Sequence, residues 1–134
     1  MQKRFFTVEE ANKLLPDIRQ EIEALQHIRN EFHQKYLELT TYKKRHPQQI
    51  AINTQDEYIF KMEASLEFLE MQAQMHVANI HSHGVQLKEI DPGLVDFPAL
   101  INGEEVLLCW QEGEEKITHY HGLHDGFAGR RRLE

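Results

Sequence analysis

The chain of 134 residues has only one cysteine, Cys109, so it cannot form an internal disulfide. It has no run near the roughly 20 apolar residues that span a bilayer, and no basic N-terminal flank before an apolar stretch of signal-peptide length. Positive charge is scarce, because 15 Lys and Arg face 22 Asp and Glu and leave a net charge of −7. Standard glycine-rich phosphate loops are also missing. We therefore expect a cytosolic protein that binds neither membranes nor nucleic acid.

The N-terminal third of the chain has the pattern of one long helix. Thr7-Val8-Glu9-Glu10 has the form of a capping box, in which each terminal side chain accepts from the other residue's amide. Apolar residues then recur in steps of three and four, the spacing of one helical face. The length allows one domain, residues 1–134, and we predict its first helix over residues 7–45. The stripe is Leu14, Leu15, Ile18, Ile22, Leu25, Ile28, Phe32, Tyr36 and Leu39.

Proline and basic residues mark two points of this helix. Pro16 removes one backbone hydrogen bond, which predicts a kink near Asn12 or a first turn set apart from the rest. The basic run from Lys43 to Arg45 complements the negative end of the helix dipole, and Pro47 ends the element. A phosphate-binding cluster is the alternative for this run, but capping charge is the simpler interpretation.

A second helix is predicted over residues 54–83. Thr54-Gln55-Asp56-Glu57 forms another capping box, and Gly84 is a natural stop. One apolar stripe predicts a seam against the first helix, in a coiled-coil-like antiparallel hairpin. A second stripe lies on roughly the opposite side. The first stripe is Ile59, Met62, Leu66, Leu69, Ala73, His76 and Ile80, and the second is Phe60, Ala64, Phe68, Met71 and Met75.

The second stripe needs a cover, since large exposed apolar stripes are rare on soluble monomers. The candidates are the C-terminal part of this chain and the same hairpin from another copy. Helical hairpins with spare apolar surface commonly dimerise into four-helix bundles. We therefore hypothesise a homodimer through the second helix. Within the first stripe, His76 has no metal-ligand partner three or four residues away, so we expect it to be partly buried and structural.

Residues 85–121 predict a small antiparallel β-meander lobe, because short apolar runs alternate with turn residues. Asp91-Pro92-Gly93 suits a type II turn with Gly93 at positive φ, and Asn102-Gly103 suits a two-residue hairpin. Glu112-Gly113 is expected to turn the chain a third time. The strands are Leu94–Ile101, Glu104–Gln111 and Glu115–His121, with Val85–Ile90 as a candidate fourth and 122–134 as a C-terminal loop and tail.

Two-residue turns would set the strand register and thereby the two faces of the sheet. Ile101 would lie opposite Glu104, and Gln111 opposite Glu114. Cys109 would then point away from His119 and His121, which disfavours a Cys-His-His zinc site, although a three-residue loop would reverse this. The face expected on the helices is Val95, Phe97, Ala99, Val106, Leu108, Trp110, Ile117, His119 and His121, and the other is Asp96, Leu100, Leu107, Cys109, Lys116, Thr118 and Tyr120.

Several short motifs, specific only together, resemble the uncharacterised bacterial family DUF2203 over nearly the whole chain. The resemblance implies a small cytosolic bacterial protein and brings no activity, cofactor or catalytic residue. The family has an aromatic pair ahead of the matching histidine, where this chain has His119-Tyr120. The motifs are FTVEEAN from Phe6 to Asn12, Gly84-Val85, GLVDFPA from Gly93 to Ala99, VLLCW from Val106 to Trp110, Gly113-Glu114, His121, and GFAGR from Gly126 to Arg130.

A divalent metal site is one functional hypothesis for the C-terminal segment. His119 and His121 are two apart on a strand and project to one side, while His124 and Asp125 could add ligands from the following loop. Such a site would lower the pKa of a bound water, as in metal-dependent hydrolases. Glycines bound this segment, and none of the four ligands has an identifiable supporting partner.

An anion or small-ligand pocket is the second hypothesis. Glycines on both sides of Phe127 let the backbone bend, Phe127 could anchor the loop in the core, and Arg130 offers a planar fork for carboxylate or phosphate. The alternative is that Arg130 pairs inside the fold with Asp96 or Glu114. The predicted ligand-binding residues are Arg130, His121, Trp110, Glu114 and Asp96.

A dimeric binding or interaction protein is the third hypothesis, and the one we favour, because the surplus apolar surface supports it directly. The helical hairpin would make the dimer, and the lobe would present a surface to a protein partner or a small anionic ligand. A metal-dependent enzyme that uses the C-terminal histidines is the alternative, and a divalent metal is the one cofactor we consider. Nucleophilic catalysis by Cys109 is weakly supported, since it has neither a basic turn nor an obvious paired histidine on its predicted face.

Overall fold

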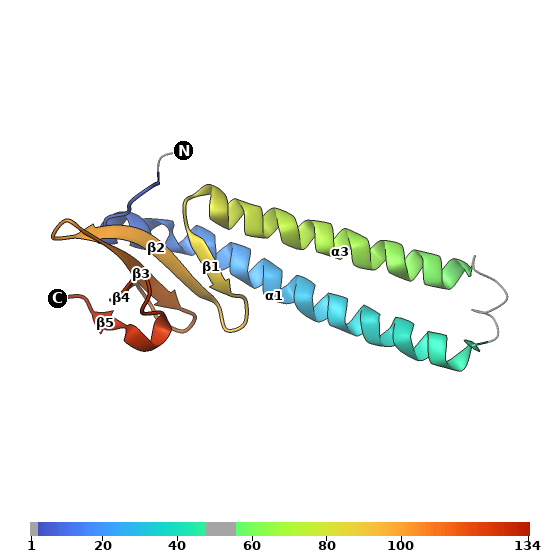
Figure 1. Ribbon diagram of the computed structural model, residues 1–134. Coiled ribbons are helices and arrows are strands. Elements are labelled where there is room, and N and C mark those ends of the chain that lie inside the picture. Colours follow the sequence, from blue (N-terminus) through green and yellow to red (C-terminus); the bar gives the residue numbers. More distant parts are fainter. Residues whose placement is uncertain (1–2, 48–55) are drawn as a thin grey trace.

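The computed structural model describes residues 3–47 and 56–134 and has the predicted α+β fold. Two long helices lie side by side and run in opposite directions, and an antiparallel sheet follows them at one end (Figure 1). Within the described residues, neither helix has an apolar stretch that could cross a membrane. The elements are α1 (Val8–Arg45), α3 (Glu57–Ser82), β1 (Gln86–Glu89), β2 (Leu94–Ile101), β3 (Glu104–Gln111), β4 (His119–Gly122), the 3-10 helix η1 (Phe127–Gly129) and β5 (Arg131–Arg132).

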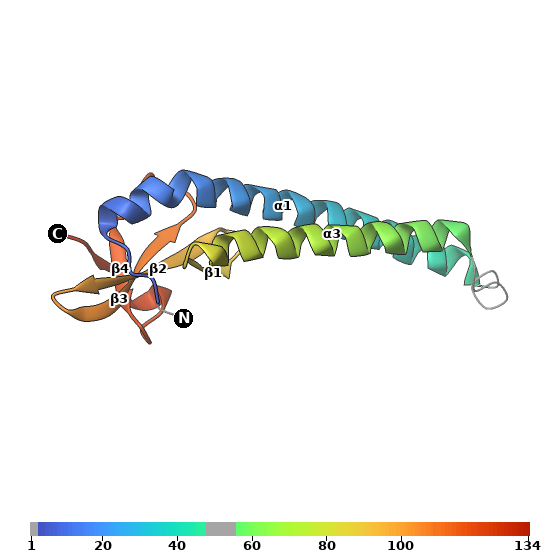
Figure 2. The ribbon, with the colours of Figure 1, turned by 90° about the horizontal axis from the view of Figure 1, so that it is seen from above.

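Helix α1 begins at the predicted capping box. The amide of Glu10 donates to Thr7 Oγ1 over 3.0 Å, and the amide of Thr7 donates to Glu10 Oε1 over 2.9 Å. The helix runs without interruption through Pro16, so the alternative of a separate first turn is wrong (Figure 2). Buried contacts hold it there, because Leu15 and Ile18 on either side of the proline belong to the core.

Helix α3 begins at Glu57, three residues later than predicted, since Asp56 is its N-cap. The amide of Ile59 and the hydroxyl of Tyr42 both donate to the Asp56 carboxylate, over 3.0 and 2.8 Å, and these bonds lower its pKa. The predicted cap Thr54 lies outside the described residues. The predicted seam is confirmed, because Leu66, Leu69 and Ile80 are buried and the other seam residues are half-buried.

The sheet has the order β1-β2-β3-β4-β5 and is antiparallel throughout. Ile101 lies opposite Glu104, with Asn102 and Gly103 at φ 53° and 81°, so the predicted hairpin is confirmed. Strand β1 confirms the candidate fourth strand. Strand β5 lies in the segment predicted as a loop and tail, and that prediction is wrong for Arg131 and Arg132, which pair with β4. Two residues offer too little periodicity to predict a strand.

The type II turn predicted at Asp91-Pro92-Gly93 is wrong. The Asp91–Pro92 peptide bond is cis, and Gly93 does not have the positive φ that such a turn requires. Gly93 serves another purpose, because a Cβ at this position would lie 2.8 Å from Ile22 Cγ2. The glycine therefore allows close approach of the turn to α1 rather than an unusual dihedral angle.

The register predicted between the strands Glu104–Gln111 and Glu115–His121, which correspond to β3 and β4, is also wrong. Val106 lies opposite Gly122 and Cys109 opposite His119, so the connection spans residues 112–118 instead of two residues. This connection, the β3–β4 link, leaves the sheet because hydrogen bonds to residues outside the β3–β4 pairing hold it. The indole of Trp110 donates to the Glu114 carbonyl over 2.9 Å, and the amide of Ile117 donates to Asn12 Oδ1 over 2.7 Å.

One face of the sheet packs on α1, and it is the predicted face with Tyr120 in place of the two histidines. Figure 2 shows the N-terminal half of α1 crossing the sheet, whereas its C-terminal half extends beyond the sheet beside α3. The other face carries His121, because the register moves His119 and His121 to the side of Cys109. The core between α1 and the sheet contains Phe6, Ala11, Leu15, Ile18, Ile22, Val95, Phe97, Ala99, Val106, Leu108, Trp110 and Ile117.

Asn12→Ala is expected to lower the free energy of unfolding by about 1–3 kcal/mol, because it leaves the amide of buried Ile117 without an acceptor. Chemical denaturation measures the change. Gln20→Ala, on the exposed side of the same helix, is the control and should change stability by less than about 0.5 kcal/mol. Equal stability of the Asn12 and Gln20 variants would contradict this account of the β3–β4 link.

Candidate functional site

The face of the sheet turned away from α1 holds a buried polar cluster of Asp96 from β2, Cys109 from β3 and His121 from β4. Their exposed fractions are 2%, 0% and 3%. Asp96 lies directly opposite Cys109 in the β2–β3 pair, and His121 lies two residues along from the partner of Cys109 in β4. The three side chains therefore meet across three neighbouring strands. The C-terminal segment lies beside this part of the sheet, through the pairing of β4 with β5 (Figure 1).

The cluster has a defined geometry. Nε2 of His121 lies 3.2 Å from Asp96 Oδ1, and Nδ1 of the same ring lies 2.8 Å from the Gly122 carbonyl oxygen. One carboxylate oxygen of Asp96, Sγ of Cys109 and one ring nitrogen of His121 all lie within 4.8 Å of one another. Carboxylate, thiolate and imidazole in such proximity are ligand types that zinc sites use.

Burial and the neighbouring Asp96 charge raise the pKa of the Cys109 thiol to about 12, although Arg130 opposes the shift. The side chain is therefore a thiol and not a thiolate at neutral pH when no cation is present. A protonated, buried sulfur is a poor nucleophile. This agrees with the weak support for nucleophilic catalysis in the sequence.

The sequence-based prediction that Cys109 points away from His121 is therefore wrong. A two-residue turn after Gln111 would have placed the two side chains on opposite faces. The actual link changes the pairing by an odd number of residues, which reverses every side chain of β4. Cys109 was missed as a site residue for this reason. The length of the β3–β4 link is the feature that sets the face of His121, and the sequence pattern did not give this length.

Arg130 pairs inside the fold, as one of the two alternatives proposed. Its Nη2 donates to both carboxylate oxygens of Glu114, over 2.8 and 2.7 Å, and its side chain is 13% exposed. The guanidinium also lies 4.8 Å from the ring centroid of Phe127. Phe127 is 43% exposed, so the expectation that it anchors the loop in the core is wrong. The backbone of the loop instead packs closely on Asp125, since a Cβ at Gly129 would lie 2.6 Å from Asp125 Cβ.

Four of the five predicted ligand-binding residues form two direct pairs, Asp96 with His121 and Arg130 with Glu114. The fifth, Trp110, contacts the Glu114 carbonyl through its indole nitrogen.

A hollow of about 240 Å³ lies next to Trp110 between α1 and the β3–β4 link. Its lining has one arginine against four glutamates, so it suits a cationic group better than an anion. The lining residues are Arg19, Ile22, Glu23, Trp110, Glu112, Gly113, Glu114 and Glu115.

The four histidine and aspartate ligands predicted for a metal are not brought together. His119 forms a hydrogen bond with Thr118 Oγ1 over 2.9 Å, and His124 is exposed. Asp125 accepts a bond of 3.2 Å from the amide of Gly122 and so serves the turn. In the part of the chain that the structure describes, the one group with metal-ligand spacing is Asp96, Cys109 and His121, which shares only His121 with the prediction.

His76 is partly buried in the helix seam, as predicted, but its partner was not foreseen. Its Nδ1 lies 2.6 Å from Glu21 Oε2, which joins α3 to α1. Asn79 also reaches Glu21, over 3.4 Å. The sequence shows Glu21 next to the buried Ile22 of α1. Its pairing with His76 could be recognised only once the position of the facing helix was known.

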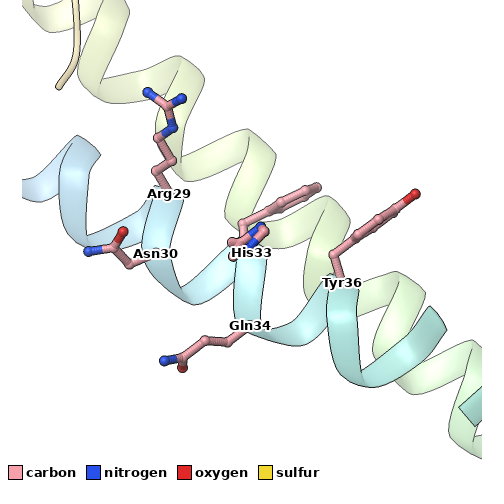
Figure 3. Close-up of a pocket in the computed structure, with 6 residues that line it drawn as sticks. Arg29, Asn30, His33, Gln34 and Tyr36 are labelled. Atoms are coloured by element: carbon pink, nitrogen blue, oxygen red, sulfur yellow. The ribbon is translucent and has the colours of Figure 1, made fainter. Parts of the chain in front are cut away.

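The pair of long helices, α1 and α3, has two surface features. The outer side of α3 exposes Phe60, Phe68, Met71 and Met75, at 72%, 60%, 66% and 54%. The second is a hollow of about 600 Å³ along α1, where Arg29 and Tyr36 stand on either side of His33 (Figure 3). All of its lining comes from this one helix, so it is an open surface and not an enclosed site.

Comparison with known proteins identifies one family. A family model described as an uncharacterised conserved protein, DUF2203, matches residues 4–133. No curated protein and no solved structure matches the chain. The comparisons therefore assign no activity to the cluster on the sheet or to the exposed side of α3.

Proposed function

Since the chain belongs to the uncharacterised family DUF2203, its function has to be inferred from its structure, and we propose a cytosolic interaction protein that forms a homodimer through α3. The observation that carries this proposal is the apolar outer side of α3. Four large apolar side chains on it are each more than half exposed. Full burial of one such side chain stabilises a complex by about 1.5–3 kcal/mol.

None of the residues that the structure describes covers the stripe on α3. The predicted alternative was the C-terminal part, but those residues form the sheet at the other end of the molecule (Figure 1). α1 packs on the opposite side of α3, where Leu66, Leu69 and Ile80 are buried. This supports a cover from a second molecule, because large apolar stripes on soluble proteins commonly mark such contacts.

A second copy in antiparallel orientation suits this surface. With the two-fold axis midway between Glu67 and Phe68 along the helix, Ala64 of one helix faces Met71 of the other, so a small side chain lies opposite a large one. Charge favours the same arrangement. Three of the four acidic residues of α3 precede Phe68 and only Glu70 follows it, so an antiparallel copy places the more acidic half of each helix against the less acidic half. A parallel copy would bring like charges together.

Phe68→Glu is expected to convert the dimer into a monomer of 15.9 kDa, because two buried carboxylates would lie close together beside the axis. Light scattering or native mass spectrometry at micromolar concentration measures the mass. Gln74→Glu adds the same charge at an exposed position of α3 outside the stripe, and should leave the dimer intact. A monomeric wild-type chain whose mass and solubility do not change with Phe68→Glu would contradict the proposal.

A further inference from the structure

We infer that Asp96, Cys109 and His121 bind a thiophilic divalent cation, with Zn²⁺ as the ion that fits their chemistry best. This inference goes beyond the proposed dimer and does not depend on it, because the cluster lies on the sheet and the dimer surface on α3. It also differs from the site predicted from the sequence, since it uses Asp96 and Cys109 in place of His119, His124 and Asp125.

The hydrogen bonds of His121 point to a cation at this position. A carbonyl oxygen can only accept, so Nδ1, at 2.8 Å from the Gly122 carbonyl, must carry its hydrogen. In the neutral ring Nε2 then presents a lone pair, and it faces a carboxylate oxygen of Asp96 at 3.2 Å. Two acceptors this close repel each other unless a positive charge lies between them. Either a proton or a metal ion can supply that charge.

The third donor favours a metal ion over a proton. Sγ of Cys109 lies within the same group, where all ligand atoms are within 4.8 Å of one another. Tetrahedral zinc with bonds of about 2.0–2.3 Å sets ligand atoms about 3.3–3.8 Å apart. The Nε2–Oδ1 distance of 3.2 Å is already close to this spacing, and Sγ, within 4.8 Å of the other two ligand atoms, has to approach them by at most about 1.5 Å. A thiolate ligand selects zinc over magnesium or calcium.

Charge balance supports the same conclusion. With a divalent ion, one thiolate, one carboxylate and one neutral imidazole sum to zero, which is the least costly state for a site with ligands only 0–3% exposed. The bond from Nδ1 to the Gly122 carbonyl is the type of supporting contact that orients histidine ligands. Three protein ligands leave the fourth position to a water molecule. Because the ligands are buried, the ion would join β2, β3 and β4 and serve the fold.

The test uses the full-length chain purified without a tag, and Co²⁺ as a spectroscopic substitute for Zn²⁺. We expect one equivalent of Co²⁺ to produce a thiolate-to-cobalt charge-transfer band and the intense visible bands of a tetrahedral ion. Cys109 is the only cysteine, so the band by itself assigns the sulfur ligand without any variant. One equivalent of Zn²⁺ should remove the band and raise the melting temperature.

Variants then identify the other ligands. Asp96→Asn and His121→Gln should each weaken Zn²⁺ binding by about tenfold or more. His119→Gln, a neighbour on the same strand and the same face, is the matched control and should bind Zn²⁺ as the wild type does. Wild-type protein that shows neither the cobalt band nor a zinc-dependent rise in melting temperature would overturn the inference. Loss of the band in His119→Gln with retention in His121→Gln would overturn the ligand set.

Discussion

Phe97→Ala is expected to lower the free energy of unfolding by about 3–5 kcal/mol, which is among the largest effects of one substitution in a core. The side chain of Phe97 is 0% exposed, in the layer between the sheet and α1. Its ring meets that of Phe6 edge to face, with centroids 5.3 Å apart. Removing the ring leaves a cavity and also removes the partner that holds the N-terminal segment on the sheet.

Urea denaturation measures this change, and the midpoint should fall without a change in slope. Leu100→Ala provides the control on the same strand, because Leu100 is 53% exposed. It should cost less than about 0.5 kcal/mol. A Phe97 variant as stable as the Leu100 variant would show that the inner face of the sheet does not pack on α1 as described.

The thiol of Cys109 in metal-free protein is expected to react at least about a thousandfold more slowly with an alkylating reagent than the same thiol after unfolding. Burial raises its pKa from the ordinary 9.0 to about 12, so the thiolate fraction at a given pH falls by about three orders of magnitude. Complete burial of the side chain slows the reaction further. The rate of alkylation at pH 8, with and without denaturant, measures the difference.

The same shift makes stability depend on pH in the alkaline range. The folded state binds the thiol proton more tightly than the unfolded state, so this contribution is fully present below about pH 9 and is lost as pH rises towards 12. The free energy of unfolding should therefore fall over this interval by more in the wild type than in Cys109→Ala. Equal alkaline profiles, or rapid alkylation of the folded protein, would contradict the buried position of Cys109.

Local sequence patterns were sufficient to predict the two helices and one hairpin. The capping box at Thr7 and the stripes of both helices depend on residues within a few positions of one another. The hairpin at Asn102-Gly103 depends on two residues with positive φ. Such signals act over distances that the sequence displays directly, so these elements lie close to where they were predicted.

The candidate site, in contrast, depends on contacts between residues that are far apart in the sequence. The β3–β4 link is held by a bond from Ile117 to Asn12, residues separated by 105 positions. No local pattern predicts that a side chain of the first helix accepts from this amide. An odd change in register reverses the faces of a strand, so the path of this link places His121 with Cys109 and not against α1.

The sequence by itself determined the fold class, the two opposite apolar sides of α3 and the internal alternative for Arg130, because periodicity and complementary charge are properties of the chain. Only the tertiary structure decided that Arg130 pairs with Glu114 and that Asp96, Cys109 and His121 meet. The physical reason is that these groups come from separate strands and loops. Their distances follow from register and packing, which are set by contacts between residues far apart in the sequence.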